Sequence, residues 1–506
     1  MKSPLVLGID IGTQGARVVV ADTTGRVLAD AYHEFVQAVI PGLPPGYFEQ
    51  NPDEWWVAVY MCLRQAILEL SRQGCTPDEI VAGAVDSKSG TVVLLDDENH
   101  PLHPALMHDD RRAQAEAEEV NGKGAALQKK MGYRFDASFA LPKILWLVRH
   151  EPEIWKKTRC VVHAADYITG KITDVFGVTD QNTALKTGFD LMDFNWPPFI
   201  ESNLGIDEKR LPIVIRSGET IGHISKRCAE ETGLAETTRI VAGMSGDGAD
   251  QIASGARHIG DWNTLLGTPI VFKGLTKQLL FDPLGRVYCH PHPLGYWMPS
   301  GVSKMSARVL EKRFPNANKG EFSSASLSLA PTSLLVYPLA EKDEKYPLDS
   351  LDAESFIEGH PQSEQELYAA HLEGLAYVER LNYGVLMSLG AEIRERIYTS
   401  GDGAKNLEWM QIRADVIGME CAHAANPIAA MGSAIIAASR TLFDNIEEAS
   451  AQMIQLDYVI SPRPEMVLRY ADSYPNFLDA CRRHGFVNDL RQSPTGIFTD
   501  LDHLSQ

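Results

Sequence analysis

Asp10 stands at the end of the first apolar stretch of the chain, residues 5–9, and a turn containing Gly12 and Gly15 follows it. A carboxylate beside a turn of small residues can face a phosphate and its metal, because backbone N–H groups there are open to approach. The same residues also suit a structural hairpin, in which the two glycines permit a tight turn and Asp10 caps it. Taken alone, this stretch leaves both interpretations open.

The same order of an apolar strand and a small-residue turn recurs three times along the chain. Residues 80–85 end in Asp86, and residues 240–242 precede a Gly/Ser-rich turn that contains Asp247. Residues 397–399 precede a further Gly-rich turn and a helix. Four such units predict an α/β architecture whose site lies at the strand ends.

The elements between these units indicate two halves. Asn51-Pro52-Asp53 is typical of a helix start and predicts an amphipathic helix over residues 55–70. The apolar period predicts a long helix within residues 363–390. Residues 256–340 read as a run of strands, similar to the start of the first half, which places a domain boundary near Arg257. We therefore expect two related folds that face a cleft.

Composition restricts the class of protein. The chain has 506 residues, which suits two or three domains, and 44% hydrophobic residues, as in a soluble globular protein. Its net charge of -20 argues against nucleic acid or an anionic membrane as the main partner. The seven cysteines form no C-x-x-C pair, which predicts reduced thiols and a cytoplasmic protein without a zinc site. No apolar stretch of 18 residues predicts membrane insertion, and no export signal is expected.

Six segments together resemble the FGGY carbohydrate kinases, a family with the actin/Hsp70/hexokinase ATPase fold. The resemblance covers roughly residues 5–445, and its specificity comes from the order and spacing of the segments. Within the family, the chain looks closest to the xylulose and ribulose kinases. The segments are GIDIGTQGAR, AVDSKSGTVVLLDDENHPLHPALMHDDRRA, HAADYITGKIT, VAGMSGDGADQIASGA, LLGTPIVF and SGDGAKNLEWMQIRADVIGMECAHAANPIAAMGSAIIAA.

The resemblance implies an α/β fold of two actin-like ATPase (ribonuclease H-like) domains with a cleft between them. It places the sugar and phosphate side in residues 1–256, the nucleotide side in residues 257–460 and a helical tail in residues 461–506. The implied activity is transfer of the γ-phosphate of ATP, with Mg²⁺, to a hydroxyl of a small ketose, a pentulose such as xylulose or ribulose. A homodimer is common among such relatives.

The resemblance also implies roles for individual residues. On the phosphate and metal side these are Asp10 for the metal and, for the phosphates, Gly12, Thr13, Gly15 and Arg17. On the sugar side they are Asp86, Asp110, Arg112 and Asp247. On the nucleotide side they are Gly267, Thr268, Gly401, Gly403, Ala404 and Asn406. Phosphoryl transfer depends mostly on positioning and charge neutralisation, which such groups supply.

The general base implied by the resemblance is Asp247, and here the chain departs from the family. Counted back from Ser254, the acid of the family falls at Gly246, so Asp247 stands one residue late and Asp250 a helical turn further on. A one-residue deletion at the helix start restores Asp247, which we favour over Asp250 or no base. In the nucleotide turns, Pro269 and Asp402 also depart from the pattern, which argues for weaker approach of the nucleotide.

These departures support two competing hypotheses. One is a catalytically weak or inactive relative that binds sugar or nucleotide in a regulatory role. The other is an actin/Hsp70-like ATPase that works on protein partners, and the sugar-side matches at Asp86 and Asp110 argue against it. Two further groups are read as structural: His290 and His292 as surface histidines rather than a metal pair, and Trp55, Trp56, Trp146 and Trp155 as core or lid packing.

Overall fold

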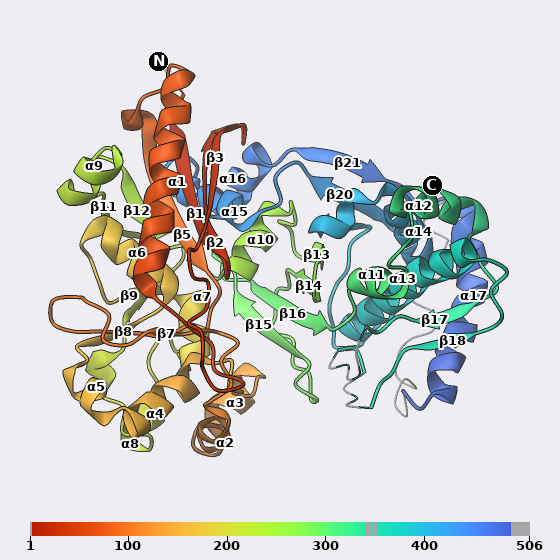
Figure 1. Ribbon diagram of the computed structural model, residues 1–506, viewed down its shortest axis with the longest axis horizontal. Coiled ribbons are helices and arrows are strands. Elements are labelled where there is room, and N and C mark those ends of the chain that lie inside the picture. The colour runs from red at the N-terminus through yellow and green to blue at the C-terminus, as the bar shows by residue number, and fades with distance from the viewer. Residues whose placement is uncertain are drawn as a thin grey trace. The chain divides into compact units, whose positions relative to one another are not determined.

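The computed structural model describes residues 3–486 apart from 341, 343, 345, 349 and 351. Its contacts divide the chain into two compact units (Figure 1). Unit 1 holds residues 3–257, 290–296 and 426–455, and unit 2 holds residues 258–289, 297–425 and 456–486. Residues 426–455, which the sequence assigns to the second domain, therefore pack in the first unit. The expected helical tail contains α17 (Pro464–Arg483) of unit 2, and its residues 487–506 lie outside the described residues.

A six-stranded sheet lies at the centre of unit 1, in the order β11-β12-β5-β1-β2-β3. Its strands are β1 (Leu5–Ile11), β2 (Gly15–Asp22), β3 (Val27–Glu34), β5 (Ile80–Ser87), β11 (Thr220–His223) and β12 (Arg239–Val241). β1 pairs with β2 in antiparallel and with β5 in parallel orientation, and β12 runs parallel to β5. Two predicted acids, Asp10 and Asp86, are register partners at the ends of β1 and β5.

Both faces of this sheet are covered by helices, so its central strands are largely apolar. Leu5, Leu7 and Ile9 of β1 join the core cluster that includes Trp55 of α1 (Pro52–Arg72). α1 begins where predicted, because Asn51 caps it through a hydrogen bond from Asp53 N and Pro52 occupies its first turn. The other helices of the unit that pack on the sheet or on each other are α6 (Ala164–Thr173), α9 (Lys226–Thr232), α10 (Gly246–Ala253), α15 (Ala429–Ala438) and α16 (Ile446–Met453).

α15 packs closely against β1, β5 and α10. A Cβ atom on Gly8 of β1 would lie 1.7 Å from the carbonyl oxygen of Ala430, and one on Gly432 would lie 1.9 Å from that of Ala249. Only glycine permits such approach at both positions. The small-residue sequence of α15 therefore serves to bring a helix from near the end of the chain onto the first strand.

Small elements outside the main sheet also belong to unit 1, and all of them except β4, which precedes α1, lie between β5 and β11 in the chain. Two strand pairs, β4 (Glu49–Gln50) with β7 (Ala105–Leu106) and β6 (Val93–Leu95) with β8 (Cys160–Val162), are antiparallel. β9 (Val178–Asp180) and β10 (Ile213–Ile215) form a parallel pair. The helices of this part are α2 (Gln114–Lys123), α3 (Ala125–Met131), α4 (Ala140–His150), α5 (Pro152–Lys157), α7 (Gln181–Ala184) and α8 (Phe199–Ser202).

The sheet of unit 2 repeats the strand order of the first. Its order is β15-β16-β14-β13-β19-β20-β21. β16, β14 and β13 form an antiparallel meander, β19 and β20 run parallel to β13, and β21 closes the edge in antiparallel orientation. Apart from the extra β15, this is the pattern of unit 1. The strands are β13 (Trp262–Leu266), β14 (Ile270–Gly274), β15 (Val287–Pro291), β16 (Trp297–Ser303), β19 (Arg396–Ser400), β20 (Glu420–Ala424) and β21 (Leu456–Ile460).

The core of unit 2 holds a buried ion pair. Arg413 donates from Nε and Nη2 to Glu379, both at 2.6 Å, and both side chains are almost fully buried. Thr264 of β13 donates to the same carboxylate at 2.7 Å. The pair joins α13 (Glu364–Ser388) to α14 (Leu407–Ile417), while α11 (Arg308–Arg313), α12 (Lys319–Leu329), β17 (Leu335–Tyr337) and β18 (Phe356–Glu358) complete the unit. Burial of both partners means that loss of either would leave an unpaired charge.

The histidines and tryptophans that the sequence analysis reads as structural have different outcomes. His290 and His292 are buried, with 1% and 2% of their surface exposed, so the prediction that they lie at the surface is wrong. The ring of His292 stacks on Tyr296, with 5.7 Å between centroids, and burial lowers its pKa to about 3. Trp55 and Trp155 are buried, as expected of core residues.

The helices of the described residues include none that is both long and apolar enough to cross a membrane. α13 has 25 residues, but Glu373, Glu379 and Arg380 interrupt its apolar surface.

Replacement of Gly8 by alanine tests the contact between α15 and β1. Because the added Cβ would overlap the Ala430 carbonyl, we expect Gly8→Ala to cost about 3 kcal/mol or more of unfolding free energy. The matched control is Gly122→Ala in α2, where nothing lies within 4 Å of the added atom and helix propensity predicts a gain of up to about 1 kcal/mol. Urea unfolding of both variants measures the difference. Equal stability of the two would show that α15 can move away from the sheet at little cost.

Candidate active site

Two carboxyl groups lie side by side at the edge of the first sheet. Asp10 and Asp86 end the neighbouring parallel strands β1 and β5 in register, so both point to the same face. Ser433 of α15 donates to Asp86 Oδ2 at 2.6 Å, whereas Asp86 Oδ1 is buried and receives no hydrogen bond in the described part of the chain. Asp86 Oδ1 is therefore an acceptor that a ligand can satisfy.

The electrostatics of this pair disfavour two full negative charges. Burial raises the pKa of Asp10, and a side-chain hydrogen bond with Asp86, followed by the charges of Lys88 and Arg17, partly offsets that rise. The pKa of Asp86 is raised well above its ordinary value, first by burial and then by repulsion from Asp10. A cation or a hydrogen-bond donor beside the pair would stabilise the ionised carboxylates and so lower both pKa values. The pair is therefore suited to bind a metal ion or sugar hydroxyls.

A third carboxylate, Asp247, belongs to the same group. It lies in the first turn of α10, where the helix N-terminus favours a negative charge. Its Oδ1 accepts a hydrogen bond from Nζ of Lys88, which follows β5. The charges of Asp247, Asp250 and Asp10 all raise the pKa of Lys88. The structure therefore brings together the predicted residues Asp10, Asp86 and Asp247, with Lys88 among them.

A buried lysine fixes the loop that carries Lys88. Nζ of Lys143, on α4, donates to three carbonyl oxygens: Gly90 at 3.0 Å, His108 at 3.2 Å and Ser138 at 3.0 Å. Lys143 has no exposed surface, and burial lowers its pKa to about 7. These contacts join three separate segments around one amine.

The first hairpin is held by contacts within unit 1. Gly12 N donates to Gly15 O at 2.9 Å, and Gln50 Nε2 donates to the carbonyl of Thr13 at 2.9 Å. A Cβ on Gly15 would lie 2.5 Å from a β3 carbonyl oxygen, so close strand packing rather than turn geometry requires glycine there. Arg17 pairs with Asp30 through Nε and Nη2 at 2.8 and 2.9 Å. Thr13 is half-buried and the turn is open, whereas Arg17 already has a carboxylate partner.

Asp110 and Arg112 form a separate buried network. Arg112 donates to Asp110 from Nε and Nη2 at 2.8–3.0 Å and to Glu49 from Nη2 at 2.6 Å. Its guanidinium also lies over the rings of Tyr47 and Trp146, at 3.9 and 4.9 Å from their centroids. The charges of Asp110 and Arg112 are therefore buried rather than solvated at the start of α2. Their ion pairs fix the segment before α2 against Glu49. Contact with a sugar remains a prediction for these two residues.

The predicted nucleotide turns lie together in unit 2. Gly267 and Thr268 form the turn between β13 and β14, and Thr268 is exposed. Gly401 has φ +86°, and a Cβ on it would lie 2.9 Å from the carbonyl oxygen of Leu266. A Cβ on Gly403 would lie 2.7 Å from the Leu266 side chain. Both glycines are therefore needed for the close approach of the two turns.

The remaining residues of the second turn have structural contacts. Ala404 is fully buried, and Asn406 caps α14 by accepting from Trp409 N at 2.9 Å while donating to Ser323 at 2.9 Å. The side chain of Asp402 is 94% exposed and pairs with Lys405, so it points away from the packed side of the turn.

Sequence profiles compared with the chain match both halves. The profile of the FGGY family of carbohydrate kinases, N-terminal domain, matches residues 5–253, and that of the C-terminal domain matches residues 303–440. The chain belongs to the FGGY family of carbohydrate kinases. The resemblance noted from the six segments is thus confirmed, as is the prediction of a phosphotransferase.

Individual relatives agree with this assignment. This FGGY kinase is 26% identical to the xylulose kinase of Lactococcus lactis over 481 residues, 93% of this chain and 95% of that protein. It is 24% identical to the autoinducer-2 kinase of Yersinia pseudotuberculosis over 498 residues, 93% of each protein. Its fold is similar to the crystal structure of xylulose kinase from Rhodospirillum rubrum (TM-score 0.83, 24% identity, 95% of this chain and 99% of that one). It is also similar to gluconate kinase from Lactobacillus acidophilus (TM-score 0.83, 19% identity, 95% and 98%). The predicted α/β fold of the actin-like ATPase type is confirmed.

A metal ion would find only part of its ligands in this kinase. No group of three or more His, Cys, Asp or Glu side chains among the described residues could hold one by itself. Mg²⁺ is usually bound by one or two carboxylates, with phosphate oxygens and water completing the shell. Asp10 with Asp86 fits that requirement, because both are oxygen donors and Asp86 Oδ1 lacks a partner.

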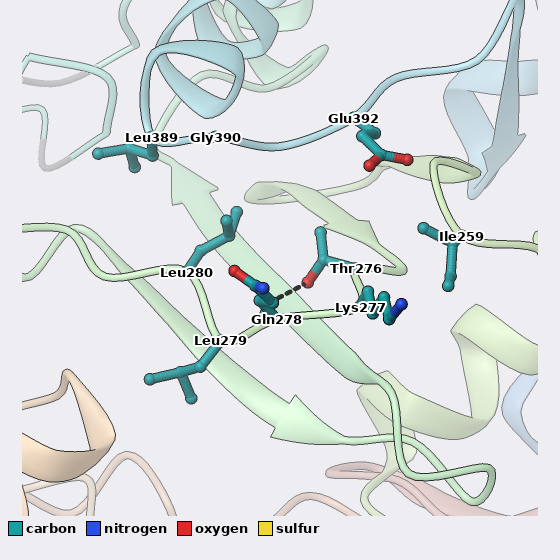
Figure 2. A pocket seen from close by; sticks show the side chains of 9 residues that line it. All are labelled: Ile259, Thr276, Lys277, Gln278, Leu279, Leu280, Leu389, Gly390 and Glu392. Carbon is teal, nitrogen blue, oxygen red and sulfur yellow. Dashed lines mark hydrogen bonds between the residues drawn. The ribbon is translucent and has the colours of Figure 1, made fainter.

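A separate cavity of about 290 Å³ opens in unit 2 (Figure 2). It lies between the segment 276–280, which follows β14, and residues Leu389 and Gly390 after α13. Thr276 donates to the carbonyl of Gln278 at 2.8 Å along its wall. None of the predicted nucleotide residues lines it, so the cavity is not the predicted ATP site.

Three residues of the site were missed by reasoning from sequence. Lys88 lies two residues after Asp86, and a cation in a strand-end turn was a signal that could have been used. Ser433 is 347 residues from its partner Asp86, so no local pattern could connect them. Lys143 sits within a helix that reads as apolar, and its three carbonyl partners come from distant segments.

Replacement of Lys143 by methionine tests the cost of its burial. The pKa of Lys143 is lowered from 10.5 to about 7 by burial, so between pH 7 and 10 the unfolded chain binds more protons than the folded kinase. The unfolding free energy therefore rises with pH through this group, by at most about 1.4 kcal/mol per pH unit. We expect the stability of the native kinase relative to Lys143→Met to increase from pH 7 to pH 9, measured by urea unfolding.

The control for this experiment is Lys156→Met, which removes an exposed lysine of α5 that pairs with Glu153. Its stability relative to the native kinase should not change over the same pH range. A constant difference for Lys143→Met as well would show that the buried amine keeps its ordinary pKa.

Proposed function

We propose that this FGGY kinase transfers the γ-phosphate of ATP to a hydroxyl of a small ketose, a pentulose such as xylulose or ribulose. The observation that carries the proposal is the convergence of Asp10, Asp86, Lys88 and Asp247 at the strand ends of unit 1. Relatives named xylulose kinase, matched over more than 90% of both chains, support the choice of a pentulose. A carboxylate pair that can hold a metal or bind hydroxyls, with a further acid near it as a base, suits such chemistry.

The charges around the site favour a neutral acceptor. Lys88 is matched by Asp247, and burial lowers the pKa of His108 to about 4, so that its ring is neutral at pH 7. A site for an anionic sugar would need positive charge in excess of its carboxylates. Hydroxyl groups, in contrast, find acceptors in Asp86 and Asp247.

In the proposed reaction, Asp247 accepts the proton of the acceptor hydroxyl as its oxygen forms the new bond to the γ-phosphorus of ATP. The bond from that phosphorus to the bridging oxygen breaks, and ADP leaves with the electron pair. Because the transition state is loose, the proton leaves late and the placement of Asp247 matters more than its basicity. Asp10 would hold Mg²⁺, which when bound neutralises charge on the phosphates. The open turn at Gly12 and Thr13 offers backbone N–H groups to the same phosphates.

The thiols support a proposal for the compartment of the kinase. All seven cysteines lie in the described residues and are free, and six of them are buried. Reduced thiols are typical of the cytoplasm, which we propose as the location of the kinase.

Replacement of Asp247 and Asp250 by alanine separates the two candidate bases. We expect Asp247→Ala to lower kcat with the pentulose by about 10²–10⁴-fold, the usual contribution of a general base, while ATP binding persists. Asp250→Ala should have a far smaller effect, because its Cα lies about 4.5 Å further along the axis of α10. The measurement is sugar-dependent ADP release with xylulose and ribulose, with gluconate and glycerol as comparison acceptors. If Asp250→Ala is the more costly change, Asp250 is the base.

Replacement of Asp10 by asparagine tests the metal role. A carboxylate that acts through Mg²⁺ on charge developing in the transition state should affect rate more than sugar affinity. We therefore expect Asp10→Asn to lower kcat by at least about tenfold more than it raises KM for the pentulose. Equal changes in the two would indicate that Asp10 binds the sugar instead.

A further inference from the structure

Lys88 is the residue of the site whose placement the fold controls most tightly. Before it, Ser87 Oγ accepts a hydrogen bond from Ala165 N of α6 at 3.1 Å. After it, the carbonyl of Ser89 accepts from Lys186 Nζ at 3.3 Å and that of Gly90 from Lys143 Nζ at 3.0 Å. The backbone on both sides of Lys88 is therefore fixed by contacts from three different elements.

The conformation of Gly90 belongs to the same arrangement. Its φ is +98°, and a Cβ there would lie 2.4 Å from the carbonyl oxygen of Ser138. The loop can thus pack against the segment that Lys143 also binds. The main chain of Lys88 is held in this way, so only its side chain can change conformation. That side chain donates a hydrogen bond to Asp247.

Asp247 is held from the other side. α10 packs on α15, where Gly432 lets the two backbones approach to contact distance at Ala249. Lys88 and Asp247 are partly exposed, with 44% and 26% of their side chains open to solvent. The ion pair therefore joins two rigid supports while remaining open to a substrate.

The geometry at Gly246 explains why the acid stands at 247. A Cβ on Gly246 would lie 3.3 Å from Asp86 Oδ1. An acid at 246 would therefore point at Asp86. The negative charge of Asp10 already disfavours ionisation of Asp86. One residue later, the carboxylate meets the ammonium of Lys88 instead. The displaced acid and the lysine are thus complementary features of this chain.

We propose that Lys88 is a positioning residue, which holds the carboxylate of Asp247 in the orientation from which it accepts the proton of the acceptor hydroxyl. The proposal rests on the function proposed above. An ionised carboxylate has about four acceptor positions, of which the bond from Lys88 uses one, and 26% of the Asp247 side chain is open to an approaching hydroxyl. Lys88 acts through Asp247 and supplies no proton itself.

A double-mutant cycle tests this assignment. The proteins are the native kinase, Lys88→Met, Asp247→Asn and the double variant, and the measurement is kcat with the pentulose at saturating ATP. We expect Lys88→Met alone to lower kcat by about 10–10²-fold, the effect of a misplaced catalytic group. In the Asp247→Asn background the same change should lower kcat by less than about threefold, because Lys88 has lost the group through which it acts.

Two further variants separate positioning from a structural effect. Lys88→Arg, which keeps the charge, should restore at least a third of the native kcat, whereas a purely structural loss would not depend on charge. Lys156→Met removes an exposed lysine elsewhere and should leave kcat unchanged. KM for ATP should stay within about twofold of the native value for Lys88→Met, since Lys88 is not proposed to touch the nucleotide.

The outcomes distinguish this inference from the proposed function. If Lys88→Met lowers kcat equally in both backgrounds, or raises it, Lys88 acts independently of Asp247 or competes with the acceptor, and the inference is overturned while the pentulose activity stands. Absence of sugar-dependent ADP release by the native kinase would instead overturn the proposed function. In that case the same four proteins are compared by their urea midpoints, where non-additive shifts support the pair and additive shifts overturn it.

Discussion

The contact of α15 with β1 and α10 is the constraint on which unit 1 depends. α15 lies more than 400 residues after β1 in the chain, yet glycines let its backbone approach both partners directly. Through Ser433 it reaches Asp86, and through Ala249 it sets the position of α10 and hence of Asp247. A sheet edge and a helix start thus acquire a fixed geometry from a third element that contributes no acid of its own.

The charges of the site lie on this rigid arrangement of α15, β1 and α10 at a cost to the stability of the fold. Asp10, Asp86 and Asp247 converge, and burial raises the pKa of the first two. A core evolved for stability alone would not place carboxylates together at the ends of two buried strands. Lys88 offsets part of the repulsion, and a bound cation or hydroxyl would offset more. Local conflict of this kind is expected where a site has to bind and react.

How much of this could be predicted from sequence depended on the range of the interactions. The strand ending at Asp10 and the helices over 55–70 and 363–390 were located to within a few residues, because apolar period and capping are local signals. The sequence did not predict the burial of His290 and His292 or the packing of residues 426–455 in unit 1. Both depend on segments far away in the chain. The same holds for the site. Asp10, Asp86 and Asp247 follow from strand-end motifs, whereas Ser433 and Lys143 meet their partners only after folding.

The membership of residues 426–455 in unit 1 has a consequence for biosynthesis. A ribosome completes the first sheet, with β1, β5 and β12, long before it translates α15. Domains usually fold as they emerge, but here the face of β1 that carries Gly8 lacks its cover until α15, residues Ala429–Ala438, has been synthesised. The nascent chain must therefore hold an apolar sheet surface open through synthesis of most of unit 2. Transiently exposed apolar surface favours aggregation, so a chaperone that covers this face during that interval would assist folding.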